Sequence, residues 1–385
     1  MLGLDGGVLK LLGRLLGSLE CFLRTFREPV ESHQKLVTRT DSRLIYRPMI
    51  FRRYRWLAAG TGVAVLAALV ATAMRIAVTG GHPHEVLAAS VVQGNASDLR
   101  KPAWYQLSIV SGDVAFTGVG AGTSTNQPAI SASSGILVDI DTKRILWQFD
   151  PRTLLPPAST VKMLTALVVL DNYSPDRKVT ATADALRQAV DETKLGMLPG
   201  QTLTVRELLT AMLLASANDA ASVLAYDTVG LDRFVGAMNA QAAALGLTDM
   251  HVASPVGLDD PGTRASAYDL AVLAATVFDR FPLFRDIVGA RSTTIAATST
   301  HPAFVIDNNN GLLQKYAPAV GIKPGWTGDA GACEVGMAVR DGHRLIDVLM
   351  RGTLVYTESA RLLDWGFTQE GLPPLLPPQP TATPR

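Results

Sequence analysis

The spacing of apolar residues divides this chain into three parts. Before residue 131 the dominant feature is one uncharged apolar run, whereas from Ser131 onward apolar residues recur with the periods of strands and helices. This pattern ends near residue 372, where a proline-rich tail begins. We therefore expect one folded domain at residues 131–372, preceded by a membrane segment and a linker.

The patterned part begins and ends with strands. Residues 135–140 and 144–149 are apolar runs on either side of Asp141-Thr142-Lys143, which predicts a β-hairpin. Towards the C-terminus, strands are predicted at residues 291–298, 320–326, 334–339 and 344–350, the last two around an Asp341-Gly342 turn.

Helices are predicted between these two groups of strands. Thr204 and Glu207 form a capping box before an apolar helix that runs to Leu214. The other helical stretches are residues 159–170, 219–229, 231–245, 266–280 and, after the last strand, 357–365. Strands that bracket a helical block predict an α/β domain of the α+β type, in which helices cover the faces of an antiparallel sheet.

The apolar run at residues 56–74 is long enough to cross a bilayer and carries no charge. Arginines are concentrated before it, so residues 1–55 are predicted to be cytoplasmic and the rest of the chain exported. Two interpretations stay open. The run is an uncleaved anchor, or it is a signal peptide cut near Ala71-Thr72-Ala73. Met49 offers an alternative start, which would leave the residues before it untranslated.

The segments on either side of the domain are predicted to lack regular structure. Residues 75–130 are rich in Gly, Ala, Ser and Thr with few charges, which is typical of a linker. Residues 373–385 are proline-rich and are predicted to be disordered.

Composition excludes several function classes. The net charge of +1 gives no reason to expect a nucleic-acid partner. Two cysteines, Cys21 and Cys333, cannot build a disulfide framework or a thiolate metal site. His82 and His84 lie in the linker and form no metal-binding pattern with the other histidines. We expect neither a metal nor a cofactor.

Three short motifs occur in a fixed order within the domain. They are Ser159-Thr160-Val161-Lys162, Ser216-Ala217-Asn218 and Lys323-Pro324-Gly325, which read as S-x-x-K, S-x-N and a variant of K-T-G. Each motif alone is weak, since S-x-x-K recurs at Ser32 and S-x-N at Ser124, outside the domain. The set in this order is typical of penicillin-binding proteins and serine β-lactamases.

The first motif pairs a nucleophile with a base. A serine hydroxyl attacks only when a base removes its proton, and Lys162 lies one helical turn after Ser159 on the same face. The lysine can accept a proton only as a neutral amine. Burial and nearby cations such as Lys323 would lower its pKa from the ordinary value of about 10.4.

The longer segments around these motifs resemble one family. PPASTVKMLTAL, LLTAMLLASANDAA, SPVGLDDPG and GIKPGWTGDAGAC are similar to the serine D-alanyl-D-alanine carboxypeptidases, the low-molecular-mass penicillin-binding proteins of peptidase family S11. The resemblance covers residues 131–370. It implies the penicillin-binding transpeptidase and serine β-lactamase-like fold, an antiparallel sheet flanked by helices together with an all-helical subdomain.

The resemblance also implies roles for individual residues. Ser159 would form the acyl-enzyme, Lys162 would act as base, and Ser216 would pass a proton to the leaving amine. The residues implied in substrate binding are Asn218, Lys323, Gly325, Trp326 and Thr327, with the backbone N–H groups of Ser159 and Trp326 forming the oxyanion hole. The implied partners are peptidoglycan stem peptides, β-lactam antibiotics and the membrane.

Pro324 departs from the family pattern, which has a threonine or serine there. Proline supplies neither a hydroxyl nor an N–H, so recognition of the substrate carboxylate is in doubt. Thr327 carries the hydroxyl that could compensate. A non-catalytic wall-binding or sensor module on the same fold therefore stays open. A class A β-lactamase is disfavoured because no glutamate occurs between Glu207 and Glu334 to deacylate it.

Overall fold

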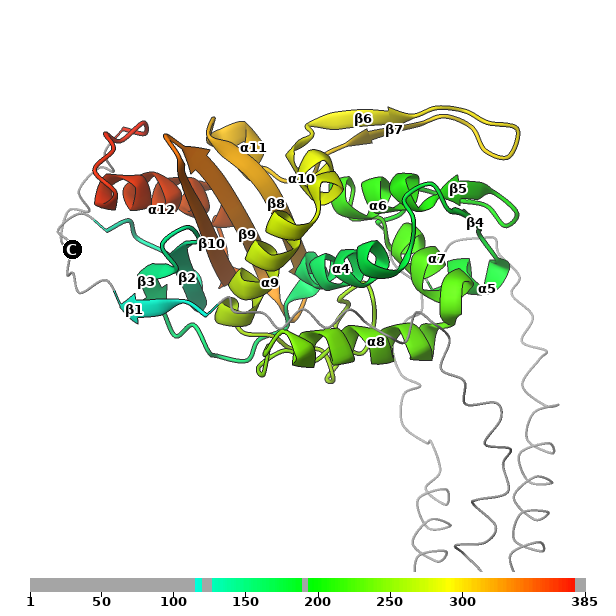
Figure 1. The fold of residues 1–385 in the computed structure, drawn as a ribbon, viewed down its shortest axis with the longest axis horizontal. Coiled ribbons are helices and arrows are strands. Elements are labelled where there is room, and N and C mark those ends of the chain that lie inside the picture. The colour runs from blue at the N-terminus through cyan, green and yellow to red at the C-terminus, as the bar shows by residue number, and fades with distance from the viewer. Residues whose placement is uncertain (1–114, 120–126, 189–192, 378–385) are drawn as a thin grey trace, which may run out of the picture. The chain divides into compact units, whose positions relative to one another are not determined.

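A computed structural model describes residues 115–119, 127–188 and 193–377 of the chain (Figure 1). A six-stranded sheet in the order β1-β3-β2-β10-β9-β8 forms its centre. Its strands are β1 (Thr117–Val119), β2 (Ser134–Asp139), β3 (Arg144–Phe149), β8 (Ala319–Thr327), β9 (Gly331–Arg340) and β10 (His343–Gly352). All neighbours pair antiparallel except β1 and β3, which are parallel. Strand β8 is an edge of this sheet.

Both predicted hairpins of the sheet are confirmed. Strands β2 and β3 pair antiparallel, and so do β9 and β10. Asp341 and Gly342 join β9 to β10 with φ angles of 49° and 86°. Positive φ at both central residues is the geometry of a type I′ turn, which matches the twist of the strands it joins.

Helices cover both faces of the sheet (Figure 1). Helix α12 (Val355–Gln369) and the short α11 (Leu312–Lys315) lie on one face, and α9 (Ala267–Arg280) and α10 (Pro282–Gly289) pack on the other. Along β9 and β10, alternate residues enter two different cores. Met337 and Val348 join the core with α9, whereas Ala338 and Leu349 join the core with α12. A sheet buried on both faces explains why its strands read as nearly continuous apolar runs.

A mostly helical part lies beside the sheet (Figure 1). Its helices are α4 (Lys162–Asn172), α5 (Ala183–Gln188), α6 (Val205–Leu214), α7 (Asn218–Val229) and α8 (Leu231–Ala244). The capping box is confirmed, since the Thr204 side chain accepts from the Glu207 N–H and the Glu207 carboxylate accepts from the Thr204 N–H. Gly230, with φ of 86°, separates α7 from α8.

Several elements were not predicted. These are the strands β4 (Lys178–Thr180), β5 (Thr202–Thr204) and β7 (Phe304–Asp307), which are too short for a clear alternation. Strand β7 pairs with β6 (Ser292–Ile295), which confirms the strand predicted at residues 291–298 over a shorter range. Pro282 ends the preceding helix as predicted, but it also begins α10, because proline is tolerated at the first helical position.

The predicted boundaries of linker and tail need correction. Residues 117–119, assigned to the linker, form β1, and the adjacent Phe116 is buried against the Tyr268 ring. In the predicted disordered tail, the N–H groups of Leu375 and Leu376 donate to the Asp364 carboxylate. Low-complexity composition concealed these contacts, which depend on partners distant in sequence.

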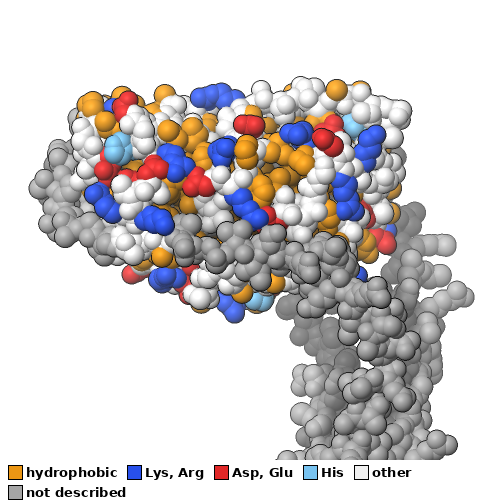
Figure 2. Space-filling model, in the orientation of Figure 1, with side chains coloured by type: hydrophobic (Ala, Val, Ile, Leu, Met, Phe, Trp, Pro, Cys, Tyr) orange, Lys and Arg blue, Asp and Glu red, His pale blue; other side chains and the backbone are white. Residues whose placement is uncertain are grey.

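The predicted membrane segment at residues 56–74 and the leader before it lie outside the described residues. Among the helices that the structure does describe, none has the length and apolar character needed to span a membrane. On the face of the molecule seen in Figure 2, acidic and basic side chains are interspersed and do not gather by sign.

Candidate active site

Ser159 lies on a 3₁₀ turn, Ala158–Val161, that leads directly into α4. Ser159 is half-buried. The residue before it, Ala158, has a positive φ of 50°, which a residue with a Cβ atom rarely adopts. The predicted helix therefore begins three residues later than expected, at Lys162. A strained backbone next to a candidate nucleophile is typical of functional sites.

Two glycines from distant segments pack against this turn. A Cβ atom on Gly257 would lie 2.0 Å from the Ala158 carbonyl oxygen, and one on Gly325 would lie 2.7 Å from the Ser159 nitrogen. Only residues without a side chain allow such close approach of two backbones. The glycine of the third motif therefore holds strand β8 against the backbone of Ser159.

Lys162 is fully buried, and its Nζ atom reaches three oxygen atoms. It donates to Ser159 Oγ at 2.9 Å, to Asn218 Oδ1 at 2.8 Å and to the Val256 carbonyl oxygen at 2.9 Å. Of these three oxygens, only the serine hydroxyl carries a proton. A neutral Lys162 amine is thus positioned to take a proton from Ser159 and from neither of the other two groups.

The second motif occupies the connection between α6 and α7. Ser216 has a positive φ of 61°, and only 6% of its surface is exposed. The Asn218 N–H donates to the Thr193 carbonyl at 2.8 Å, while its side chain holds Lys162. The Asp219 carboxylate accepts from three consecutive N–H groups at residues 195–197. Sequence reasoning missed Asp219, although an acidic residue beside S-x-N at a helix start was a visible signal.

The third motif lies on edge strand β8, where Pro324 pairs with Glu334 of β9. Proline is tolerated on an edge because alternate residues there turn their N–H away from the neighbouring strand. Lys323 is fully buried and donates to the Pro324 carbonyl at 3.1 Å. Burial lowers the pKa of Lys323 to about 7, against an opposing effect of the Glu334 carboxylate.

Behind this strand lies a buried acidic pair that the sequence analysis did not identify. Glu334 and Asp347 are both fully buried, and Ser359 Oγ donates to Asp347 Oδ1 at 2.8 Å. Burial raises the pKa of Asp347 to about 7, and burial together with Asp347 raises the pKa of Glu334 well above its usual range. Gly336 leaves space for the Asp347 carboxyl group, because a Cβ atom at this position would lie 2.3 Å from Asp347 Oδ1. A polar residue inside an apolar strand was the available signal.

A cavity of about 450 Å³ opens beside Ser159. Of the predicted site residues, Ser159, Ser216, Gly325 and Trp326 line it. Trp326 is the most exposed of them, with 71% of its surface accessible. The rest of the wall comes from β8, β9, the start of α12 and the segment around α11. Its residues include Asn309, Lys315, Pro324, Cys333, Leu354 and Tyr356.

The other predicted residues lie around the cavity without lining it. Lys162 and Asn218 are behind Ser159, and Lys323 is buried beneath β8. Thr327 is buried, and its hydroxyl accepts a 3.1 Å hydrogen bond from the Ala330 N–H.

A family model described as D-alanyl-D-alanine carboxypeptidase, peptidase S11, matches residues 121–353. The chain belongs to this family. Its membership confirms the resemblance drawn from the three motifs, and it identifies the protein as a serine carboxypeptidase.

Individual family members show the extent of the match. The D-alanyl-D-alanine carboxypeptidase DacB2 of Mycobacterium tuberculosis is 37% identical over 244 residues, which is 61% of this chain and 82% of that protein. The D-alanyl-D-alanine carboxypeptidase DacA of Escherichia coli is 33% identical over 254 residues, which is 62% of each chain.

Solved structures agree with the predicted fold class. A D-alanyl-D-alanine carboxypeptidase from Mycobacterium tuberculosis superposes with a TM-score of 0.60 at 35% identity, covering 64% of this chain and 95% of that one. The DD-transpeptidase of Streptomyces K15 gives 0.59 at 30% identity, covering 63% and 100%. The prediction of an antiparallel sheet flanked by helices, in the penicillin-binding fold, is confirmed.

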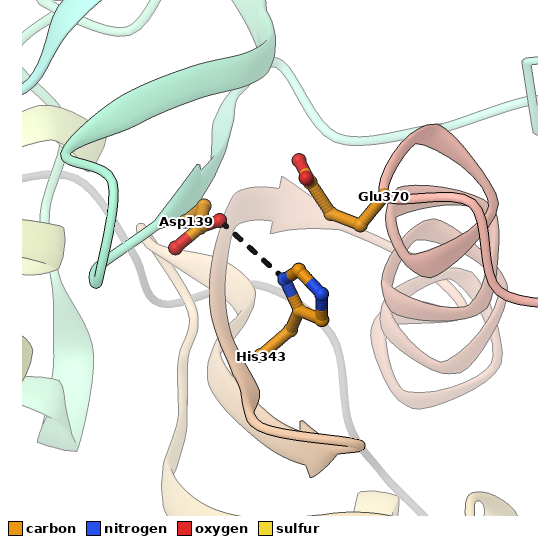
Figure 3. A group of neighbouring side chains, drawn as sticks. All are labelled: Asp139, His343 and Glu370. Carbon is orange, nitrogen blue, oxygen red and sulfur yellow. Dashed lines mark ion pairs between the residues drawn. The ribbon is translucent and has the colours of Figure 1, made fainter.

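One group of described side chains outside the cavity could offer ligand atoms to a metal ion (Figure 3). Asp139, His343 and Glu370 bring three such atoms within 4.8 Å of one another. His343 Nδ1 lies 3.9 Å from Asp139 Oδ2, and Glu370 Oε1 accepts a 2.7 Å bond from Arg144. Because none of the three lines the cavity, we assign the group to the packing of α12 on the sheet.

Proposed function

We propose that this carboxypeptidase removes the terminal D-alanine from peptidoglycan stem peptides through an acyl-enzyme on Ser159, and that penicillins acylate the same serine. The single observation that carries the proposal is the 2.9 Å hydrogen bond between Lys162 Nζ and Ser159 Oγ at the wall of the cavity. A lysine with a purely structural role would not require the nucleophilic hydroxyl of Ser159 as its hydrogen-bond partner.

In the first step, neutral Lys162 takes the Ser159 hydroxyl proton as Oγ bonds to the carbonyl carbon of the penultimate D-alanine. The carbonyl electrons move onto oxygen, and the N–H groups of Ser159 and Trp326 stabilise that charge. The closeness of Gly325 to the Ser159 nitrogen supports this assignment, because it brings the backbone of β8 next to the backbone of the serine.

In the second step, the C–N bond breaks and the departing amine needs a proton. Ser216 lines the cavity and can pass the proton from protonated Lys162 to the leaving nitrogen. D-Alanine leaves, and the acyl group stays on Ser159. Water then gives its proton to Lys162 as it attacks the ester, and Ser159 Oγ departs with a proton. The net reaction is hydrolysis of one peptide bond.

Release of D-alanine tests the proposal. The purified chain, incubated with a pentapeptide ending in D-Ala-D-Ala, should release one D-alanine per peptide, and Ser159→Ala should release none while keeping its melting temperature within a few degrees. A non-catalytic wall-binding module would release no D-alanine and form no penicillin adduct, and these two results together would reject the enzyme proposal. Rapid turnover of a penicillin would point to a β-lactamase.

We infer that residues 56–74 attach the enzyme to the membrane, with residues 1–55 in the cytoplasm and the catalytic domain outside it. The uncharged apolar run and the arginines before it support this proposal. Membrane fractionation and sequencing of the mature N-terminus test it. A mature N-terminus near residue 74 would mean a cleaved signal and would reject the anchor.

A further inference from the structure

The cavity beside Ser159 is also lined by residues that lie outside the three motifs. One of them is Lys315, the last residue of α11. Three others, Thr353, Tyr356 and Thr357, carry hydroxyl groups. At about 450 Å³ the whole cavity exceeds the space that one terminal alanine requires.

Lys315 supplies the charge of this cavity. Every other residue that lines it is neutral, and no carboxylate is among them. Lys315 is exposed, and among the ion pairs of the described residues none includes it. A cation with no acidic partner, facing a cavity without acid, favours an anionic ligand.

The lysine of the third motif is less well placed for that task. Lys323 has no exposed surface, does not line the cavity, and already donates to the Pro324 carbonyl. Burial also lowers its pKa to about 7, so a large share of it is uncharged at neutral pH. Pro324 itself carries no hydroxyl. The C-terminal carboxylate of a peptide therefore needs another partner in this chain.

We propose that Lys315 is the cation of a carboxylate subsite, which binds the free C-terminus of the acyl-donor peptide. The Thr357 hydroxyl would complete the hydrogen bonding of the carboxylate, since the hydroxyls of Thr353 and Tyr356 already contact Ser131 and the Asn309 carbonyl. A peptide added antiparallel to the free edge of β8, with its reacting carbonyl at Ser159 and Trp326, places its last residue beside Pro324, which lines the same cavity as Lys315. This subsite rests on the proposed function and assigns substrate specificity within it.

The test compares two peptides that differ only at their C-terminus. One is an N-acylated tripeptide ending in D-Ala-D-Ala with a free carboxylate, and the other is its C-terminal amide. The loss of one charge-assisted contact should lower kcat/KM of Lys315→Gln for the free acid about 10- to 100-fold. Its kcat/KM for the amide should change less than twofold. The ratio of kcat/KM for the free acid to kcat/KM for the amide should therefore fall by about the same factor as the value for the free acid.

Two matched variants complete the experiment. Lys315→Arg should keep most of the preference for the free acid, because it keeps the charge. Lys178→Gln removes an exposed lysine of β4, outside the cavity, and should leave both rates unchanged. An active wild-type enzyme whose preference survives Lys315→Gln would overturn the subsite alone. A wild-type chain that neither releases D-alanine nor forms a penicillin adduct would overturn the proposed function and the subsite with it.

Discussion

Lys162 Nζ donates a 2.9 Å hydrogen bond to Ser159 Oγ across the start of helix α4. The two residues belong to different elements, since Ser159 is in the 3₁₀ turn and Lys162 is the first residue of the α-helix. The turn places the serine at the cavity, and the helix keeps the lysine buried behind it. Asn218 and Val256 complete the contacts of the amine and fix its position.

Removal of the Lys162 amine should reduce the rate of acylation far more than it reduces the stability of the fold. Lys162→Ala should slow acylation by penicillin about 10²- to 10⁴-fold, because the base is lost while Ser159 remains. The variant should also melt at a lower temperature, since two buried acceptors lose their donor. Stopped-flow labelling, performed well below both melting temperatures, separates the two effects. Acylation at a wild-type rate would show that another group acts as base.

The contact between Gly325 and Ser159 predicts a steric effect. A methyl group at Gly325 would lie 2.7 Å from the Ser159 nitrogen and 2.9 Å from the Ala158 Cβ, so Gly325→Ala should force β8 away from the serine. We expect the acylation rate to fall by about 10²-fold or more, which is the usual cost of a lost oxyanion donor.

Gly236→Ala is the matched control for this prediction. Gly236 lies in α8 with no atom within 4 Å of its added Cβ, and alanine there should stabilise the helix by up to about 1 kcal/mol. Its acylation rate should equal that of the wild type. Equal rates for both glycine variants would refute the role of Gly325.

Pro324 gives a prediction with two possible causes. If the missing hydroxyl weakens carboxylate recognition, Pro324→Thr should speed acylation by penicillin and by D-Ala-D-Ala peptides about tenfold or more. Pro324 lines the cavity, so the new hydroxyl would face the substrate. Acylation rate and melting temperature should be measured together. A slower rate at unchanged stability would mean that the site has adapted to proline.

Burial of Asp347 predicts a pH-dependent stability. Its pKa is about 7 in the folded chain and near 3.8 when unfolded, so the folded state binds more protons between these values and loses stability as pH rises through them. Asp347→Asn should therefore raise the melting temperature more at pH 8 than at pH 4, by roughly 5 °C or more. The asparagine oxygen can still accept from Ser359.

Asp176→Asn, in an exposed loop, serves as the control for the general effect of removing one carboxylate. Calorimetry of both variants at the two pH values gives the comparison. Equal shifts at pH 4 and pH 8 for Asp347→Asn would mean that this carboxyl is not protonated by its burial.

The sequence alone predicts the catalytic residues of this domain better than the long-range contacts that hold them in place. Ser159, Lys162 and the Thr204 capping box follow from local spacing, because the partners lie within one helical turn. The Val256 carbonyl, Gly257 and the Glu334–Asp347 pair depend on segments far apart in the chain, which no local pattern brings together. The burial of Lys323 is of the same kind, since a charged residue in a short strand reads equally well as exposed.

The most direct test of the central claim is intact-protein and peptide mass spectrometry after exposure to benzylpenicillin. The account predicts a single covalent adduct on the wild-type chain, mapped to the peptide that contains Ser159, and no adduct on Ser159→Ala of equal melting temperature. An adduct that persists on Ser159→Ala, or that maps to another residue such as Ser216, would contradict the assignment of Ser159 as the nucleophile.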